Sequence, residues 1–253
     1  MIPPPATRHG VMTHGSRPFR GLTVFRRGDT LGSMRFLDRA EAGLHLARAL
    51  APHRTADAVV VAIPRGGVAV AAEVARLLQL PLEVLVACKV PAPGRPEIAL
   101  GAVAEVGVRH VDLGLAGVLG LTPSALQAEV EAAEAEVARR ALLYRKGRKR
   151  RDLRGRPVLV VDDGIARGGA VRAAIEALQR LGVGVIVVGV PVAAASVAEA
   201  MAGSVGALVT LVRPAVLHSI GEWYEDFRPL DDDAVLARLY APLREVEGEH
   251  VAA

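Results

Sequence analysis

Cysteine and aromatic residues are scarce in this sequence. Cys88 is the single cysteine, which excludes an intrachain disulfide and a zinc site built from cysteines. Aromatic residues make up only 3% of the chain, so Ala, Val and Leu have to form most of the core. We therefore expect a reduced, cytoplasmic protein in which the cysteine is a buried core residue.

Long apolar runs are also missing. No stretch approaches the roughly 20 consecutive apolar residues that a membrane-spanning helix needs. The N-terminal residues do not combine a compact apolar run with a small-residue cleavage site, so we expect no signal peptide. Both observations predict a protein without membrane contacts.

Positive charge is in excess at one end of the chain only. Residues 1–33 hold five arginines against Asp29, a net charge of +4, which equals the formal charge of the whole chain. Residues 34–253 are therefore neutral overall, which weakens any expectation that the folded body binds nucleic acid. Residues 1–33 show no helical or strand periodicity, and we expect a disordered tail, with a natural start at Met34 as one interpretation.

Short Val-rich runs alternate with segments whose apolar residues recur every three or four positions, so strands and helices are expected to alternate. We expect strands at 57–63, 82–90, 157–161, 183–190 and 207–212. Helices are expected at 38–50, 68–80, 122–147, 170–181 and 196–201, with a last one within 222–244. This order predicts an α/β domain over residues 34–244, in which helices cover both faces of a central parallel sheet.

Three further segments complete the expected organisation. Residues 91–120 are rich in Pro and Gly and are expected to be irregular, apart from a short β-piece at 99–103. Thr122 and Pro123 fit the N-cap and first position of the long helix, and Gly147 is its expected end. Residues 245–253 are expected to be a flexible C-terminus.

Two adjacent acids and a glycine-rich turn follow the run Val158–Val161. The order is Asp162-Asp163-Gly164-Ile165-Ala166-Arg167-Gly168-Gly169-Ala170, and a helical pattern comes next. Such a turn directs several backbone N–H groups to one point in front of a positive helix end, which makes an anion site. The acids would repel a bound phosphate unless a neutral, hydroxyl-rich group lay between them. In a ribose 5-phosphate, the ribose hydroxyls can bond to the acids while the phosphate reaches the glycine-rich turn. The segment therefore predicts a phosphoribose site.

A second turn of this kind, Pro64-Arg65-Gly66-Gly67, lies between the first expected strand and the next helix. Taken alone, such a turn is more often a plain tight turn. Ligands of parallel sheets bind beyond the carboxyl ends of the strands, so we expect it near the acidic pair. The nucleotide-binding patterns GxxxxGK[ST] and GxGxxG after a strand are absent from the sequence.

The acidic-pair segment resembles the diphosphoribosyl-binding signature of the type I phosphoribosyltransferases. Over roughly residues 34–240 the chain is also similar to a bacterial subgroup of that family, on the segments Pro64–Gly67, Cys88–Glu97, Leu100–Glu105 and Tyr224–Phe227. The resemblance implies a Rossmann-like core with a small hood. It also implies transfer of ribose 5-phosphate from phosphoribosyl diphosphate to an acceptor, with a nucleobase as the expected class, release of pyrophosphate and use of Mg²⁺.

The resemblance assigns roles at two turns. Asp162 and Asp163 would fix the ribose hydroxyls, and the turn 164–170 would bind the 5-phosphate. Arg65 and the amides around Gly66 and Gly67 would hold the pyrophosphate. No protein side chain is assigned as a metal ligand.

The resemblance also implies a catalytic set of Lys89, Arg65 and Glu97. Lys89 ends the second expected strand, and Arg95, Glu97 and Glu105 follow in a segment that would be the flexible loop closing over the substrate. Closure would exclude water and complete the charge around the leaving group. For Lys89 and Glu97, an ordinary solvated loop charge is the alternative.

Two positions depart from the family pattern. Arg167 stands where the family usually has Thr, and Ala170 where it has Thr or Ser. Each missing hydroxyl removes a hydrogen bond to a charged group, worth roughly 1.5–3 kcal/mol. Arg167 could replace them with a bidentate phosphate contact or could block the loop. The alternative function is therefore a non-catalytic module that senses phosphoribosyl diphosphate or a nucleotide. One version of this alternative also binds RNA.

Other features leave their alternatives open. Ten Lys or Arg residues lie from Arg139 to Arg156 against Asp152 alone, but aromatic residues are few there and nucleic-acid binding is not the expectation. Trp223, Tyr224 and Phe227 could stack on an acceptor, although core packing is favoured. The acceptor and the oligomeric state stay undetermined, with a homodimer compatible with the family.

Overall fold

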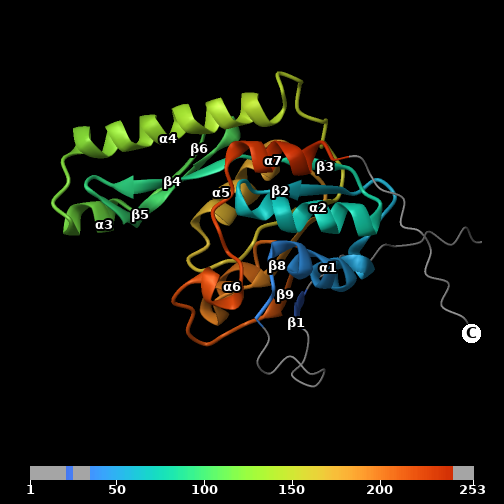
Figure 1. Cartoon of the computed structure of the whole chain (residues 1–253). Helices are drawn as coiled ribbons and strands as arrows, with labels where there is room; N and C mark the ends of the chain where they lie inside the picture. Colours follow the sequence, from blue (N-terminus) through green and yellow to red (C-terminus); the bar gives the residue numbers. More distant parts are fainter. Residues whose placement is uncertain (1–20, 25–34, 242–253) are drawn as a thin grey trace, which may run out of the picture.

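The computed structural model describes residues 21–24 and 35–241. Its centre is a six-stranded sheet with the strand order β1-β9-β8-β7-β2-β3 (Figure 1). All neighbouring strands are parallel, which confirms the predicted sheet. The strands are β1 Gly21–Val24, β2 Val59–Ala62, β3 Leu82–Val84, β7 Val158–Val161, β8 Ile186–Val192 and β9 Ala207–Val212.

Helices cover both faces of this sheet, as the sequence predicted (Figure 1). Side chains alternate along β7: Leu159 and Val161 pack in one apolar cluster, Val158 and Val160 in the other. The first cluster contains α1 (Arg39–Leu50) and α2 (Gly66–Leu78), with α7 (Asp232–Leu239) against α2. The second contains α5 (Gly169–Arg180) and α6 (Ala195–Ala202). No helix of the described ranges is long and apolar enough to cross a membrane.

The helix starts follow the capping signals in the sequence. The Asp38 carboxylate accepts the backbone N–H groups of Ala40 and Glu41 at the start of α1. The Thr122 hydroxyl accepts that of Ala125 at the start of α4 (Pro123–Tyr144). Gly147 lies in the turn that ends α4, with a φ of +72° that suits glycine.

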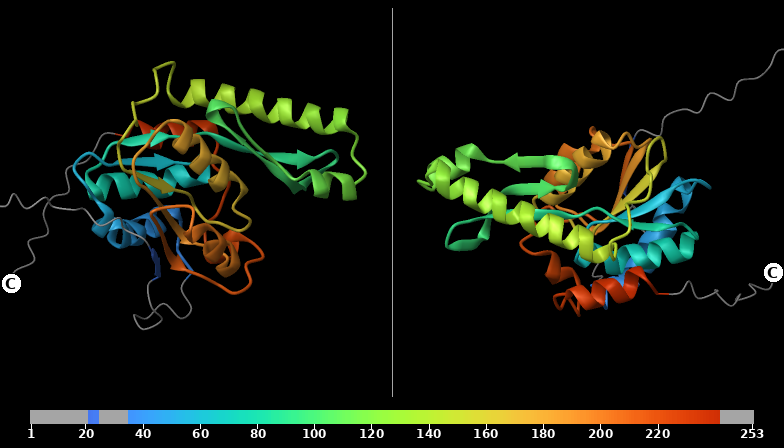
Figure 2. Two further views of the ribbon diagram at one scale, coloured as in Figure 1. Left: turned by 180° about the vertical axis from the view of Figure 1, so that it is seen from behind. Right: turned by 90° about the horizontal axis from the view of Figure 1, so that it is seen from above.

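A second sheet projects from the main body together with α4 (Figures 1 and 2). It is antiparallel and consists of β4 (Ala87–Ala92), β5 (Arg95–Ala104) and β6 (Val108–Val111). We call residues 87–144, which include α3 (Leu113–Val118), the arm. The helix α4 packs on β4 and β5, and α5 of the main body contacts all three strands. Short 3-10 turns lie at Ala51–His53, Glu105–Gly107 and Ile220–Trp223.

Two predictions for residues 82–120 were wrong. The apolar run 82–90 is not one strand but is divided between β3 of the main sheet and β4 of the arm. Residues 91–120 are not irregular, because they form most of a three-stranded sheet and a helix. Their Pro and Gly mark special positions in strands: Pro91 lies at a register shift, and a Cβ on Gly101 would be 1.9 Å from the His110 carbonyl oxygen.

The prediction that residues 1–33 contain no strand was wrong for Gly21–Val24. These residues form β1, with Gly21 opposite Ala207 of β9. An edge strand needs only backbone hydrogen bonds to its single neighbour, so the apolar alternation that we sought was not required. The other residues of the predicted N-terminal tail, and the predicted C-terminal segment 245–253, lie outside the described residues.

Candidate active site

A pocket of about 930 Å³ lies at the carboxyl ends of β2 and β7, where the arm meets the main sheet. The turn after β2, the acidic-pair loop, the start of α5, the β4–β5 hairpin and α4 contribute to its walls. All but one of the residues that the sequence predicted for the site line it. These are Arg65, Gly66, Lys89, Glu97, Asp162, Asp163, Gly164, Ile165, Ala166, Arg167, Gly168, Gly169 and Ala170.

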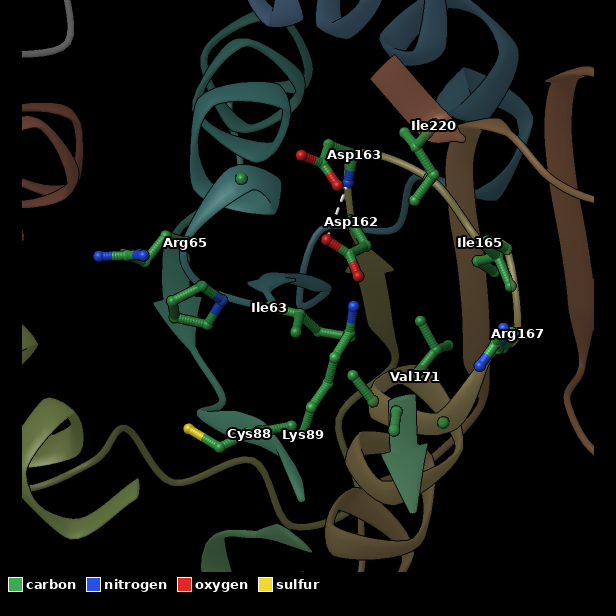
Figure 3. A pocket seen from close by; sticks show the side chains of 18 of the residues that line it. Ile63, Arg65, Cys88, Lys89, Asp162, Asp163, Ile165, Arg167, Val171 and Ile220 are labelled. Atoms are coloured by element: carbon green, nitrogen blue, oxygen red, sulfur yellow. Dashed lines mark hydrogen bonds between the residues drawn. The ribbon is translucent and has the colours of Figure 1, made fainter. Parts of the chain in front are cut away.

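Both acids of the pair line the pocket. Figure 3 shows the Asp162 carboxyl group directed toward Lys89, and one of its oxygens accepts the Asp163 backbone N–H at 2.9 Å. Burial and the adjacent Asp163 charge raise the pKa of Asp162 well above the usual carboxyl value, although Lys89 and Arg39 act in the opposite direction. This carboxyl group therefore gains most from a ligand that donates hydrogen bonds.

Asp163 is held by two residues that the sequence did not connect to it. Its carboxylate accepts the Arg39 Nε–H at 2.8 Å, and both side chains are almost buried. Its backbone carbonyl accepts the Tyr224 hydroxyl at 2.7 Å. Burial, with the Asp163 charge, raises the pKa of Tyr224, so its hydroxyl stays protonated and available as a donor.

The glycine-rich loop begins at the end of β7 and leads into α5. Ile165 anchors it to β8: its N–H donates to the Val192 carbonyl, and its side chain is 1% exposed. Its carbonyl accepts the Ala194 N–H at 2.9 Å, so both backbone polar groups of Ile165 hold the loop in place. Gly168 is the N-cap of α5 with a φ of +76°, a conformation that other residues adopt at a cost. The side chain of Arg167 is exposed beside this loop.

The glycines of the turn after β2 allow the start of α2 to approach the acidic pair. A Cβ on Gly66 would be 1.9 Å from the Asp163 Oδ2, and one on Gly67 would be 2.9 Å from the Asp162 Oδ1. Gly67 is the predicted site residue that does not line the pocket. In Figure 3 the Arg65 guanidinium points away from the two aspartates. Burial raises the pKa of the Cys88 thiol, and the Arg65 charge acts on this thiol in the opposite direction.

The arm brings Lys89 of β4 and Glu97 of β5 to the pocket. Lys89 lies in a strand, as predicted, whereas Glu97 belongs to the β4–β5 hairpin and not to the irregular loop predicted from the sequence. Arg95 is not among the lining residues. Glu105 lies elsewhere, in ion pairs with Arg145 and Arg150 at 2.9 and 3.3 Å.

Comparison with known proteins identifies the family. The profile described as phosphoribosyl transferase domain matches residues 37–205. The chain belongs to the phosphoribosyl transferase domain family. Two curated proteins of Mycobacterium tuberculosis, each named as a "putative phosphoribosyl transferase", are 39% identical to it over 204 residues.

The same comparison covers 81% of this chain and 46% of each relative, so the chain spans less than half the length of the curated relatives that it matches. The crystal structure of TT1426 from Thermus thermophilus is 39% identical, with a TM-score of 0.66. That match covers 81% of this chain and 98% of TT1426. The predicted fold class and family are confirmed.

Sequence reasoning missed several residues of this phosphoribosyl transferase pocket. Arg39 lines it, and the available signal was an arginine on the apolar face of a predicted helix. A second signal was the spacing of charged residues along one face of α4. The missed lining residues include Arg39, Glu129, Glu136, Arg140, His218 and Ile220. Hydrogen bonds from Arg139 and Arg140 lower the pKa of Glu136 to about 2.

The aromatic residues near the C-terminus pack mainly against one another. Tyr224 is 1% exposed, and its ring lies 5.4 Å from that of Phe36 and 4.9 Å from that of Phe227. The Arg39 guanidinium covers the Phe227 ring at 3.8 Å. Core packing is thereby confirmed for Tyr224, whereas Phe227 is half-buried and also lines the pocket.

Most cations of the basic segment 139–156 have partners within the domain. Arg139 and Arg140 pair with Glu136, and Arg156 donates to a backbone carbonyl. Lys146 and Arg148 lie over the Tyr240 ring. This arrangement leaves few free charges for a nucleic acid. Among the residues 21–24 and 35–241, no group of three or more His, Cys, Asp or Glu side chains is placed to hold a metal.

Proposed function

We propose that this chain transfers the ribose 5-phosphate unit of phosphoribosyl diphosphate to a small-molecule acceptor, expected to be a nucleobase, and releases pyrophosphate. One observation carries this proposal: the acidic pair, the glycine-rich loop and the turn after β2 all line one pocket. A diol, a monophosphate and a diphosphate on a single sugar would occupy these three places. The family membership supports the same class of reaction.

The sugar would be held through the acidic-pair loop. The Asp162 carboxyl group faces the pocket and would accept hydrogen bonds from the ribose hydroxyls, with Asp163 beside it. The backbone N–H groups at Gly168 and Gly169, at the start of α5, would bind the 5-phosphate. No side-chain hydroxyl is present at residues 167 and 170, so the backbone and the exposed Arg167 would supply these contacts.

The leaving pyrophosphate would lie toward Arg65, the start of α2 and Lys89 of the arm. Negative charge grows on it as the bond to the anomeric carbon breaks, and fixed cations and amides stabilise that charge. Glu97 lines the same pocket from the next strand of the arm. No protein nucleophile is needed, and the raised pKa of Cys88 keeps the only thiol of the chain protonated and unreactive.

Mg²⁺ is expected to accompany the diphosphate. Mg²⁺ usually keeps several waters and binds largely through substrate phosphates. The lack of a three-ligand cluster in the described part of the chain fits an ion that arrives with its substrate. When bound, it would neutralise charge on the departing pyrophosphate. Arg65 and Lys89 would add to that neutralisation from the protein side.

The test uses the full chain, Mg²⁺, phosphoribosyl diphosphate and a panel of nucleobases, with pyrophosphate release as the readout. Asp162→Asn is the site variant. Asp152→Asn is the matched control, because the Asp152 carboxylate accepts a hydrogen bond from the Arg154 N–H and does not line the pocket. Release that requires a base, is lost in Asp162→Asn and persists in Asp152→Asn would support the proposal.

A non-catalytic sensing module is the second candidate, favoured by the missing hydroxyls at Arg167 and Ala170. Calorimetry on the same samples separates the two. Binding of phosphoribosyl diphosphate without release across the panel would establish the sensor and refute the transferase. Absence of binding at millimolar ligand would refute both. The paired cations of residues 139–156 weigh against the version in which the sensor binds RNA.

A further inference from the structure

Arg39 occupies a position that is unfavourable for an arginine. It is the first residue of α1 and lies on the buried face of that helix, three, four and seven residues before Ala42, Gly43 and Leu46. Its side chain is 9% exposed. A cation at the positive end of a helix is repelled by the helix dipole, and a buried charge loses its hydration. Specific partners must therefore compensate for both costs.

Three contacts hold the Arg39 guanidinium from different sides. Its Nε–H donates to the Asp163 Oδ2 at 2.8 Å, and its Nη1–H donates to the Arg228 carbonyl at 3.0 Å. The Phe227 ring lies 3.8 Å from its central carbon. A planar group fixed in this way cannot follow a mobile anion, so it determines where the Asp163 carboxylate lies.

Further contacts restrict Asp163 at its backbone and at Oδ2. The Tyr224 hydroxyl donates to its backbone carbonyl at 2.7 Å, and the space next to its Oδ2 is so tight that a Cβ on Gly66 would be 1.9 Å away. Asp162 differs, because its carboxyl group accepts one local backbone N–H and otherwise faces Lys89 (Figure 3). The two adjacent acids thus have different surroundings.

We propose that Arg39 is a positioning residue that divides the acidic pair: it fixes the Asp163 carboxylate at the pocket wall through its Oδ2, whereas the Asp162 carboxyl group, directed toward Lys89, is left to be held by the sugar. Two neighbouring carboxylates repel each other, and the Arg39 charge compensates one of them where it is buried. The charged or titratable side chains around the pair are Arg39, Lys89 and Tyr224. The identity of the ligand rests on the proposed function, but the division of the pair does not.

The first test is a double-mutant cycle on the full chain. The dissociation constant of phosphoribosyl diphosphate with Mg²⁺ is measured by calorimetry for Arg39→Met, Asp163→Asn and the double variant. Each single change should weaken binding about tenfold or more, as expected for a hydrogen bond to a charged group. The double variant should bind no more weakly than the worse single variant. Losses that simply add would overturn the proposal.

The matched control is Arg35→Met. Arg35 donates to the Tyr224 carbonyl at 2.9 Å and does not line the pocket. It should bind phosphoribosyl diphosphate within about twofold of the wild type, whereas an equal loss in Arg35→Met and Arg39→Met would point to a purely structural role and refute positioning. Arg39→Lys keeps the charge but not the planar fork, so it should recover only part of the affinity.

The second test needs no ligand. Carboxyl carbons of aspartate are followed by NMR, and Asp162→Asn and Asp163→Asn identify the two signals. The signals are compared at one fixed pH. Arg39→Met should shift the Asp163 signal, because it removes the hydrogen bond to Oδ2, and should shift the Asp162 signal less. An unchanged Asp163 signal in folded Arg39→Met would refute the proposal; if that variant does not fold, Arg39→Lys is measured instead. A wild type that fails to bind phosphoribosyl diphosphate would refute the proposed function, while this comparison of signals would still decide the role of Arg39.

Discussion

Two buried arginines of this domain have similar exposure but different partners. Arg145, whose side chain is 10% exposed, pairs with Glu83 at 3.1 Å and with Glu105 at 2.9 Å. It also donates to the Val84 carbonyl at 2.7 Å. Arg39, at 9% exposure, pairs with Asp163, although Asp162 is the adjacent residue. Each carboxylate around Arg145 has a cation, whereas within residues 35–241 no ion pair reaches Asp162.

The difference separates a structural cluster from a binding site. The Arg145 cluster joins the end of β3, the 3-10 turn after β5 and the end of α4, so it ties the arm to the main sheet. Its charges compensate one another. The Arg39 cluster leaves the Asp162 carboxyl group facing an open pocket, with a raised pKa. A ligand that donates hydrogen bonds would supply the missing compensation.

The largest expected effect is on the structural side of this comparison. Arg145→Met would remove the cation that pairs with the buried Glu83 and would leave Glu105 with the more distant Arg150, which should lower the free energy of unfolding by about 3–5 kcal/mol. Urea denaturation measures the change. The affinity of the remaining folded protein for phosphoribosyl diphosphate should stay within about twofold of the wild type. A variant with wild-type stability and poor affinity would reverse the roles that we give to the two clusters.

Asp162→Asn should show the opposite pattern. Loss of a charged acceptor for the ribose hydroxyls should weaken the binding of phosphoribosyl diphosphate by about tenfold to a hundredfold, measured by calorimetry. The raised pKa means that the folded state holds the Asp162 proton more tightly than the unfolded state. Wild-type stability from this group is present at acid pH and decreases as pH rises through the folded-state pKa.

The ligand-free Asp162→Asn variant, which carries no charge there, should therefore have a higher Tm than the wild type at pH 8. The difference in Tm between the variant and the wild type should become smaller as pH falls. Thermal unfolding at several pH values measures it. A lower Tm at pH 8 would show that Asp162 is compensated in the fold like the carboxylates of Arg145.

Gly66→Ala tests the close approach of α2 to the acidic pair. The new Cβ would fall 1.9 Å from the Asp163 Oδ2, so the carboxylate has to shift away from Arg39. We expect affinity for phosphoribosyl diphosphate to fall about tenfold, the loss of one charged hydrogen bond. Gly117→Ala in α3 is the control, because a Cβ there meets no atom within 4 Å. It should be neutral or stabilise the fold by up to about 1 kcal/mol.

The smallest effect is expected for an exposed ion pair. Hydrogen bonds from Arg228 lower the pKa of Asp226 to about 2, but the two side chains are 43% and 87% exposed. Any contribution to stability is present above the usual carboxyl pKa and is lost as pH falls toward 2. Asp226→Asn should hardly change Tm at pH 7, in low or high salt. A clear, salt-dependent loss would show that this pair matters more than its exposure allows.

That the acidic-pair loop lines a pocket could be predicted because its parts are contiguous. A buried strand, two acids and a glycine turn follow one another between Val158 and Ala170, and each acts through local backbone geometry. The structure places all of them at one pocket. The start of α4 at Thr122 and Pro123 was predictable for the same reason.

The arm and the Arg39 contact could not be predicted in this way. The run 82–90 is apolar throughout, and its division between β3 and β4 depends on which strands lie beside each half. Arg39 and Asp163 are 124 residues apart in sequence, so only packing of α1 against α2 and the sheet brings them together. An apolar pattern indicates that a segment is buried, but it does not indicate which strand or helix packs against that segment.

The sequence by itself determined the α/β class, the positions of most helices and strands, and the place of the acidic-pair loop between a strand and a helix. These depend on residue spacing, capping and glycine geometry, which act over a few residues. Only the tertiary structure decided that Asp163 is bound by Arg39 while Asp162 faces the pocket. Two adjacent aspartates are equivalent in a sequence, and contacts with residues far away in the chain make them different.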